Sequence, residues 1–444
     1  MKILGISEGF HDASVCLIED GNIISASHSE RFSRIKNDKH LHPSQLVDAD
    51  VYAFYESKFL KNTRMFLSGQ GWKSDSKEYD ISFKHHESHA AAGFYTSPFE
   101  ECDILVIDSI GEWDTISIWR GKNGKMKKIK SWKYPFSVGL FYSAMTQRIG
   151  LKPNEDEYIT MGMAAYGQPI YDLEEILYSN CHKGVGNIYP NARNEDLAAS
   201  AQVTLEKFVL NLIRDNCKHE NLVFMGGVAL NCVLNTRIKI YENKNMWIMP
   251  NPGDAGSALG AAALAYGKKL NWVDPYLGTN IEREVNVRDI VDHLIKHSVC
   301  GVANGKAEYG PRALGNRSLI ADPRKDIKDT VNKIKRRQLF RPFAPAILEE
   351  YAEEYFEGPM NEYMQFTANA LHDYQSVTHV DGSARVQIVK KDCNSIIRPL
   401  LEEWYERTGC PMLLNTSLNI KGQPMVDNEK DASDFEKEYN VKVF

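Results

Sequence analysis

The segment KHHESH at residues 84–89 combines residue types and a spacing that suit metal binding. His85 and His89 are four residues apart, so on a helix they lie on one face and can share a metal ion. Asp108 ends a later strand-like run, where a carboxylate can point into a cleft. Two neutral imidazoles and one carboxylate suit Fe(II) or Zn(II) and leave coordination positions open for a substrate. A bare histidine pair at this spacing is also common as two solvated or core side chains.

Three other short motifs carry residue types found in reactive sites. His11 precedes Asp12, and it is either a base whose tautomer Asp12 or a main-chain carbonyl sets, or a turn histidine. Asp254 lies in a PGDAG turn before a predicted helix, where a carboxylate and main-chain amides can meet phosphate or metal, or where it is a plain N-cap. Gly226 and Gly227 follow a predicted strand and admit close approach of a phosphate, although glycine turns are common.

Cationic side chains gather in the last third of the chain. The planar fork of arginine matches phosphate oxygens, so several cations in one pocket can hold phosphate groups and offset the charge of an in-line displacement. The run at 333–337 alone is typical of a solvated basic face, but interleaved apolar residues such as Phe340 and Phe343 favour a rigid loop at a cleft. There is no Walker A motif to supply a P-loop. The candidate residues are Arg312, Arg317, Lys335, Arg337, Arg341 and Arg385, with Ser417 after a predicted strand at 411–414.

Hydrophobic patterns predict the elements that position these residues. Short β-branched runs and Gly turns predict hairpins, and apolar residues in helical register predict helices, one of them capped by Ser137 and ended by Gly150. Strand hairpins followed by helices predict an α/β fold with an actin-like ATPase core. The predicted strands are 2–6, 13–19, 22–27, 103–108, 114–119 and 222–225, and the predicted helices are 138–149, 197–216 and 255–266.

The length of 444 residues predicts more than one domain. A polar, turn-rich stretch at 270–285 is interpreted as a linker, so we expect domains at 1–275 and 286–444. No tandem repeat is visible at the periods typical of solenoids.

Composition limits the class of protein. A net charge of −6 argues against a protein that binds duplex nucleic acid along a broad basic face. The start resembles a strand more than a signal peptide, and the longest small-apolar run, 256–267, is shorter than the ~20 residues of a membrane span. Eight cysteines occur singly, without a C-x-x-C pair, and are expected to be reduced core thiols. These features predict a soluble, cytoplasmic protein.

The chain resembles the NodU/CmcH-type O-carbamoyltransferases along its whole length. Eleven stretches carry the resemblance in the same order: GFHDAS at 9–14, ERFSRIK at 30–36, HHESHA at 85–90, DSIGEW at 108–113, EYITMGMAAYG at 157–167, GGVALN at 226–231, DAGSALGAA at 254–262, EYGPRALGNRS at 308–318, RPFAP at 341–345, HVDGSARVQ at 379–387 and LNTSLN at 414–419.

The resemblance implies a first domain like the tRNA threonylcarbamoyl-transferase fold, an actin-like relative, and a second domain like the YrdC-type activating fold. It implies an iron-like metal at His85, His89, Asp108 and Asp254, with His11 beside it as the base. Catalytic cations would be Arg312, Arg317, Lys335 and Arg341. Residues that bind the nucleotide or substrate would be Gly226, Gly227, Asn231, Arg337, Arg385, Asn415 and Ser417.

The implied reaction has two steps. ATP with Mg²⁺ and carbamoyl phosphate give carbamoyl adenylate and pyrophosphate in the second domain, and the first domain passes the carbamoyl group to a small hydroxyl acceptor, sugar-like or a hydroxymethylated nucleotide. Alternatives are a tRNA threonylcarbamoyladenosine-type transferase and a non-catalytic nucleotide-binding regulator. The acceptor and the oligomeric state stay open, a homodimer included. The chain ends soon after 424–427, where the family usually adds a helix and a strand, so the completion of the second domain stays open and a more open acceptor pocket than usual is expected.

Overall fold

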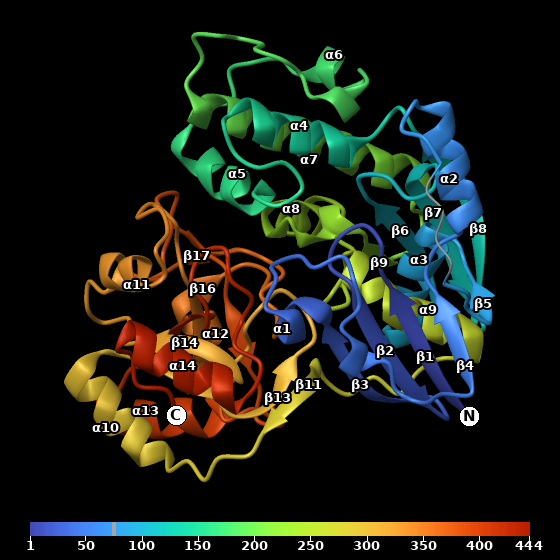
Figure 1. Cartoon of the computed structure of the whole chain (residues 1–444). Helices are drawn as coiled ribbons and strands as arrows, with labels where there is room; N and C mark the ends of the chain where they lie inside the picture. Colours follow the sequence, from blue (N-terminus) through green and yellow to red (C-terminus); the bar gives the residue numbers. More distant parts are fainter. Residues whose placement is uncertain (73–76) are drawn as a thin grey trace. The chain divides into compact units, whose positions relative to one another are not determined.

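The computed structural model describes residues 1–72 and 77–444, which divide into two compact units (Figure 1). The first unit contains Met1–Ala26 and Lys39–Trp272, and the second contains Ser27–Asp38 and Val273–Phe444. The excursion over 27–38 is held in the second unit by Arg34, whose Nη1 donates to the main-chain oxygen of Met425 at 2.7 Å. A local sequence pattern does not reveal such a long-range contact, and the domain limits expected from the sequence did not include it.

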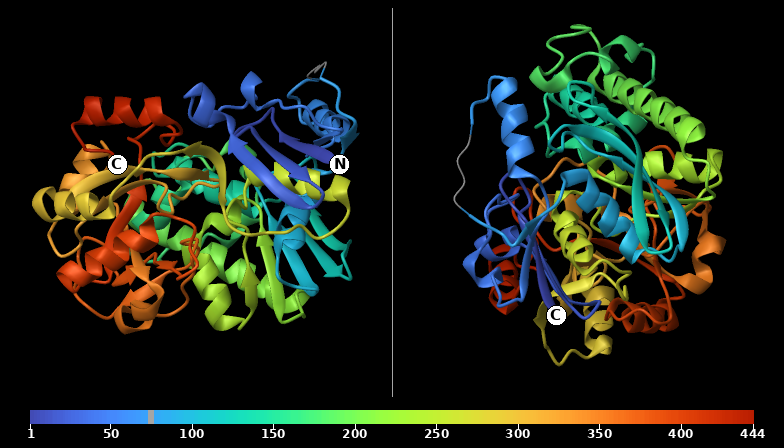
Figure 2. Two further views of the ribbon diagram at one scale, coloured as in Figure 1. Left: turned by 90° about the horizontal axis from the view of Figure 1, so that it is seen from below. Right: turned by 90° about the vertical axis from the view of Figure 1, so that its right-hand side faces the viewer.

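The first unit contains two five-stranded sheets with the same strand order (Figures 1 and 2). In the first sheet, β3-β2-β1-β4-β5, strand β1 is antiparallel to β2 and parallel to β4. In the second, β8-β7-β6-β9-β10, strand β6 is antiparallel to β7 and parallel to β9. This duplicated order is that of the actin-like ATPases, so the predicted α/β fold is confirmed. The strands are β1 Lys2–Ser7, β2 Ser14–Glu19, β3 Asn22–His28, β4 Val51–Phe54, β5 Ile81–Ser82, β6 Glu101–Ile107, β7 Asp114–Lys122, β8 Lys125–Lys133, β9 Asn221–Met225 and β10 Asn245–Trp247.

Two helices lie between these sheets and fix the candidate site. Helix α9 (Ser257–Tyr266) packs on β1, β2 and β4, whereas α3 (His85–Thr96) packs on β6, β7 and β9 and against α9. The helices approach closely at Gly260, where an added Cβ would lie 1.8 Å from the main-chain oxygen of Ser88. Only glycine fits there, and the contact holds the histidine helix beside the start of α9.

Among the remaining helices of the first unit, α4, α5 and α8 pack on α7. Helix α4 begins as predicted, because the Ser137 hydroxyl oxygen accepts a hydrogen bond from the Leu140 amide at 3.1 Å. The predicted helix at 197–216 is the greater part of α7. The helices are α2 Lys58–Leu67, α4 Val138–Arg148, α5 Glu157–Met163, α6 Glu174–Leu177, α7 Asn194–Asn216 and α8 Cys232–Tyr241.

The second unit is built on a mixed five-stranded sheet in the order β12-β14-β20-β15-β19. Helices α10 and α13 pack together and contribute Leu294, Leu401 and Trp404 to one apolar cluster against this sheet. The strands are β11 Tyr276–Ile281, β12 Val299–Ala303, β13 Gly305–Glu308, β14 Arg317–Ala321, β15 Ala344–Leu348, β16 Phe356–Glu357, β17 Ala368–Ala370, β18 Ser383–Ala384, β19 Gln387–Val389 and β20 Met412–Ser417. The helices are α1 Ser29–Ser33, α10 Val287–His297, α11 Lys328–Ile334, α12 Ala352–Tyr355, α13 Ile397–Thr408 and α14 Glu429–Tyr439.

The structure adds detail to two sequence expectations about this unit. The stretch 270–285 contains the boundary between the units, after Trp272, and it also contains β11, which pairs with β13 at 305–308. The unit also has a closing helix, α14, and Val443 forms a β-bridge with Gly301. Phe435 and Val443 pack into the core, but most of α14 is charged, so its apolar signal was too sparse to predict a helix.

Two further expectations concern cysteines and membrane spans. All eight cysteines are unpaired, and all but Cys393 are buried, as predicted for core thiols. In the described part of the chain, no helix is both long and apolar enough to cross a membrane.

Candidate active site

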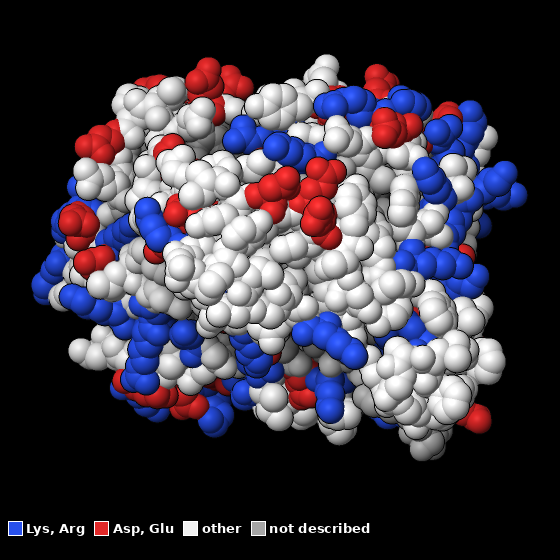
Figure 3. Space-filling view, turned by 90° about the horizontal axis from the view of Figure 1, so that it is seen from above, with Lys and Arg blue, Asp and Glu red and all other residues white. Residues whose placement is uncertain are grey.

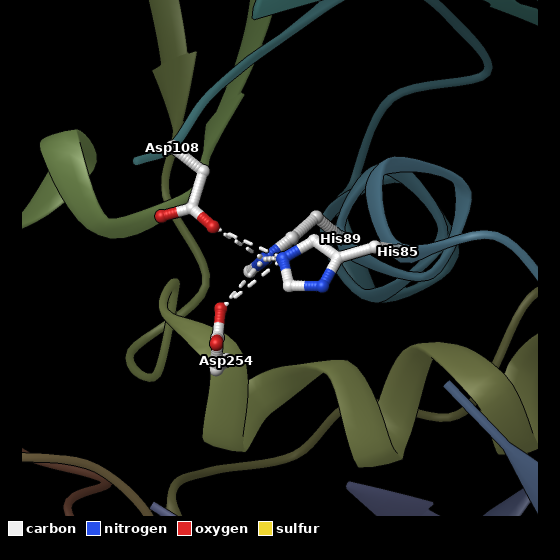
Figure 4. A group of neighbouring side chains, drawn as sticks. All are labelled: His85, His89, Asp108 and Asp254. Carbon is white, nitrogen blue, oxygen red and sulfur yellow. Dashed lines mark hydrogen bonds and ion pairs between the residues drawn. The ribbon is translucent and has the colours of Figure 1, made fainter. Parts of the chain in front are cut away.

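Helix α3 brings two histidines to two carboxylates in the first unit (Figure 4). Asp108 directly follows β6, and Asp254 lies in the 3-10 turn that precedes α9, so strand end and helix start point their side chains at one face of α3. One ligand atom from each of His85, His89, Asp108 and Asp254 lies within 4.8 Å of all the others, and all four residues are buried.

The distances in this four-residue group are short. His85 Nε2 lies 3.0 Å from Asp108 Oδ2 and 3.3 Å from Asp254 Oδ1. His89 Nε2 lies 3.2 Å from Asp254 Oδ1 and 3.1 Å from His85 Nε2. Two ring nitrogens that converge on each other and on two carboxylate oxygens form the donor arrangement of a metal centre.

Neighbouring main-chain groups orient these donors. His89 Nδ1 lies 3.1 Å from the carbonyl oxygen of Pro252, to which it can donate, so that Nε2 keeps a free lone pair. The Gly227 amide donates to Asp108 Oδ1 at 3.2 Å. Gly226 adopts a φ of +91°, and an added Cβ would lie 2.2 Å from the main-chain oxygen of Ile107. The Gly-Gly pair thus supports Asp108, and its expected contact with a phosphate stays a prediction.

The electrostatics of the group show a strong mutual stabilisation of charge. Burial alone would raise the pKa of Asp254, but His85 and His89 hold it well below its usual value. Burial alone would lower the pKa of His85, but Asp254 and Asp108 hold it well above its usual value. A divalent cation could replace these imidazole protons, because it supplies the positive charge that two buried carboxylates need.

His11 lies at the edge of this group. Its Nε2 is 3.8 Å from Asp254 Oδ2, and its Nδ1 is 2.9 Å from Asp12 Oδ2, which fixes the ring. Burial alone would lower the pKa of His11, but Asp12 and Asp254 raise it to about 9. The side chain is 32% exposed, so a substrate can reach it.

The third histidine of the segment belongs to a different set of contacts. His86 Nδ1 lies 2.8 Å from the Ser117 hydroxyl, and that hydroxyl oxygen also accepts from the Trp119 indole at 2.8 Å. Burial and the positive charges of His85 and His89 hold the pKa of His86 well below its usual value. His86 is therefore a buried neutral side chain outside the four-residue group.

In the second unit, Lys335 is the centre of a cationic cluster. Its Nζ donates to the main-chain oxygen of Ser417 and to the main-chain oxygen and Oδ1 of Asn419, the last two at 2.9 and 3.0 Å. Burial, with the charges of Arg337 and Arg341, holds the pKa of Lys335 well below its usual value. Asn419 was not a sequence candidate, although it ends the LNTSLN motif at 414–419, because its contact with Lys335 joins residues that are 84 apart in the chain.

Buried side chains hold the loop that carries Arg312 by hydrogen bonds to its main chain. Glu308 Oε1 accepts hydrogen bonds from the amides of Leu314 and Asn316 at 2.7 and 2.9 Å. Asn415, 1% exposed, donates to the main-chain oxygen of Ala313 at 3.1 Å. Asn415 thus shapes the loop, and any contact of its own with a ligand stays a prediction.

Two other candidates have distinct surroundings. Asn231 caps α8 by accepting from the Leu234 amide at 3.0 Å and exchanges hydrogen bonds with buried Gln202. Arg385 is half-buried, and its buried Nε makes no hydrogen bond in the structure. The contact of Arg385 with a ligand stays a prediction.

Arg317 does not occupy the position expected of a phosphate ligand. It is fully buried, and its guanidinium donates to the carbonyl oxygens of Thr279 and Asp427 at 2.7 and 2.9 Å and of Gly305 at 3.0 Å. Its donors are used by the protein's own main chain, so it acts as a structural cross-link between β14 and its neighbours.

We therefore expect Arg317→Met to destabilise the protein by roughly 3–5 kcal/mol, because buried carbonyls lose a charged partner. Urea unfolding followed by circular dichroism measures this change. A stable Arg317→Met protein that has lost only pyrophosphate release would contradict the structural role and restore the phosphate role.

Comparisons with known proteins agree with the sequence motifs. Residues 45–189 and 179–263 match the family described as Carbamoyltransferase N-terminus, and residues 291–444 match Carbamoyltransferase C-terminus. An uncharacterized protein of Synechocystis sp. is 32% identical over 97% of this chain and 93% of its own length. Nodulation protein NolNO of Sinorhizobium fredii is 31% identical over 95% of this chain and 76% of its own length. Component A of the Acidaminococcus fermentans (R)-2-hydroxyglutaryl-CoA dehydratase superposes with a TM-score of 0.41 at 16% identity, over 60% of this chain and 98% of that one. The matched regions account for most of both units, and the chain belongs to the carbamoyltransferase family.

Proposed function

We propose that this enzyme forms carbamoyl adenylate from carbamoyl phosphate and ATP and transfers the carbamoyl group to an acceptor hydroxyl. The observation that carries the proposal is the buried group of His85, His89, Asp108 and Asp254, with His11 at its edge. Family membership supports the transfer of a carbamoyl group. The geometry of the group, with His11 beside it, suits the activation of a carbonyl by a metal and the acceptance of a proton by a base.

The four side chains fit a divalent metal ion such as Fe(II). The two Nε2 atoms are 3.1 Å apart, His85 Nε2 lies 3.0 Å from Asp108 Oδ2, and His89 Nε2 lies 3.2 Å from Asp254 Oδ1. Two nitrogen and two oxygen donors leave coordination positions open. When bound, the metal would act as a Lewis acid toward the carbamoyl carbonyl.

His11 is suited to take the acceptor proton once the charge of the carboxylates is compensated. Its pKa of about 9 reflects Asp12 and Asp254, so a cation on Asp254 lowers that pKa and leaves Nε2 free to accept a proton at neutral pH. Asp12 keeps the other ring proton on Nδ1. The acceptor oxygen then attacks the carbamoyl carbon, AMP leaves, and His11 Nε2 holds the proton.

The second unit would make the carbamoyl adenylate, as a YrdC-like domain. Lys335, Arg337 and Arg341 lie close enough for their charges to affect one another, next to Ser417 and Asn419. Carbamoyl phosphate and water give carbamate and phosphate, and a carbamate oxygen then attacks the α-phosphorus of ATP to release pyrophosphate. Cations and Mg²⁺ offset the charge on the transferring phosphates.

We expect a small acceptor alcohol, sugar-like or a hydroxymethylated nucleotide. On the face shown in Figure 3, basic side chains form several separate groups, and acidic side chains lie between some of these groups. The lysine-rich turn at 121–128 is the tip of the β7–β8 hairpin, where Lys122 pairs with Glu101 and Lys128 with Asp114. Two lysines of this turn are therefore already held in ion pairs within the protein.

The test is incubation with radiolabelled carbamoyl phosphate, ATP and a panel of alcohols that includes nucleosides, hexoses and duplex DNA. Label should appear on a small alcohol and require ATP. Duplex DNA binding, if it occurs, should be weak. Tight DNA binding whose affinity falls by a slope of about −0.9 per neutralised phosphate, with carbamoylated bases, contradicts this choice.

A further inference from the structure

The second ring nitrogen of His85 is the starting observation. His85 is 2% exposed, and its Nδ1 makes no hydrogen bond to any residue that the structure describes. Glu56 Oε2 lies 3.8 Å from this nitrogen, just beyond hydrogen-bond distance. A buried polar nitrogen without a partner is uncommon and calls for a physical explanation.

Neighbouring residues fix the position of Glu56. It follows β4 and is 3% exposed. Its Oε1 accepts from Lys61 Nζ at 2.5 Å, while Oε2 is the oxygen on the His85 side. One oxygen of Glu112 accepts from both the Ser57 amide, at 2.7 Å, and the His85 amide, at 2.9 Å. Glu112 thus links Ser57, the residue after Glu56, to the start of α3 by hydrogen bonds.

A metal on His85 Nε2 would require the ring proton to be on Nδ1, because a neutral imidazole carries one proton. That buried N–H then needs an acceptor. We infer that Glu56 is the positioning residue that accepts it and orients His85 as a ligand. The inference rests on the proposed metal site. His89 differs, because its Nδ1 contacts a neutral carbonyl oxygen, that of Pro252. A carboxylate that accepts the Nδ1 proton of His85 makes this imidazole a more basic metal ligand than that of His89.

The competing explanation is a purely structural ion pair. Glu56 and Lys61 lie at the start of α2, and their contact would also hold this helix if no metal were ever bound. A structural role predicts lower stability without any change at His85. Metal affinity and the His85 ring proton are therefore the readouts that separate the two roles.

The experiment uses the full-length protein with Zn(II), which accepts these donors and permits NMR. Zn(II) titration calorimetry compares the wild type with Glu56→Gln, Glu56→Ala and the control Glu87→Gln, which changes a glutamate of α3 outside the four-residue group. We expect dissociation constants about 10-fold higher for Glu56→Gln and up to about 100-fold higher for Glu56→Ala, with no change for Glu87→Gln. The Nδ1 proton resonance of Zn(II)-bound His85 should move upfield in Glu56→Gln.

Each outcome decides the question. If the wild type binds Zn(II) and both Glu56 variants bind equally well, with an unshifted His85 proton, the inference is wrong while the metal proposal stands. If the wild type binds neither Zn(II) nor Fe(II), the metal proposal is wrong and this inference is wrong with it. Glu56→Gln preserves the shape of the side chain, so it decides the result if Glu56→Ala does not fold.

Discussion

Replacing His85 or His89 with alanine should abolish carbamoyl transfer and metal binding while carbamoyl adenylate formation persists. The transfer rate should fall roughly 10³-fold or more, about 4 kcal/mol of transition-state stabilisation, because each variant removes one of two nitrogen donors that lie 3.1 Å apart. Metal content of the purified protein and ATP–pyrophosphate exchange with carbamoyl phosphate measure the two effects separately.

His86→Gln is the matched control for this experiment. His86 is the next residue on the same helix and is equally buried, but its Nδ1 contacts Ser117 outside the four-residue group. Glutamine can keep a hydrogen bond to that hydroxyl, so metal content and transfer should stay close to wild type. Full transfer by a metal-free double variant of His85 and His89 would falsify the metal assignment.

The second large effect is the separation of the two half-reactions. Removing Arg341 or Arg312 should reduce pyrophosphate release by ~10²-fold or more, because a truncated phosphate partner loses a charge-assisted hydrogen bond. The His11→Ala protein should still release pyrophosphate yet transfer the carbamoyl group poorly. Release of labelled pyrophosphate from ATP and transfer from supplied carbamoyl adenylate are the two assays.

Arg336→Ala is the control for the arginine variants. Arg336 belongs to the same basic run, but it is exposed and its guanidinium lies over the ring of Tyr439, 5.2 Å from the centroid. Its removal should leave pyrophosphate release near wild type. The roles would be reversed if His11→Ala stopped pyrophosphate release and spared transfer from carbamoyl adenylate.

Local sequence determined much of the first unit. The strand pairs predicted at 13–19 with 22–27 and at 103–108 with 114–119 are present, and so is the helix after Ser137, because turn residues, caps and apolar periodicity act over a few residues. The i, i+4 spacing of His85 and His89 was sufficient to predict that both face the same way. The highly charged α14 was missed for the same reason, since its pattern contains few apolar residues.

Tertiary structure decided which partners meet. Asp254 lies 165 residues after His89, and only the packing of α9 on α3, with glycine at position 260, brings them together. Arg312 and Arg317 share one motif, yet the fold buries Arg317 against main-chain carbonyls while it leaves Arg312 half-buried in a supported loop.

The sequence by itself determined the residue types of the site, the local elements that carry them and the family to which the chain belongs. The structure alone decided that Glu56 lies beside His85, that Asn419 contacts Lys335 and that the guanidinium of Arg317 contacts main-chain carbonyls. The physical reason is that caps, turns and periodicity depend on neighbours along the chain, whereas burial and hydrogen-bond satisfaction depend on segments far apart in sequence.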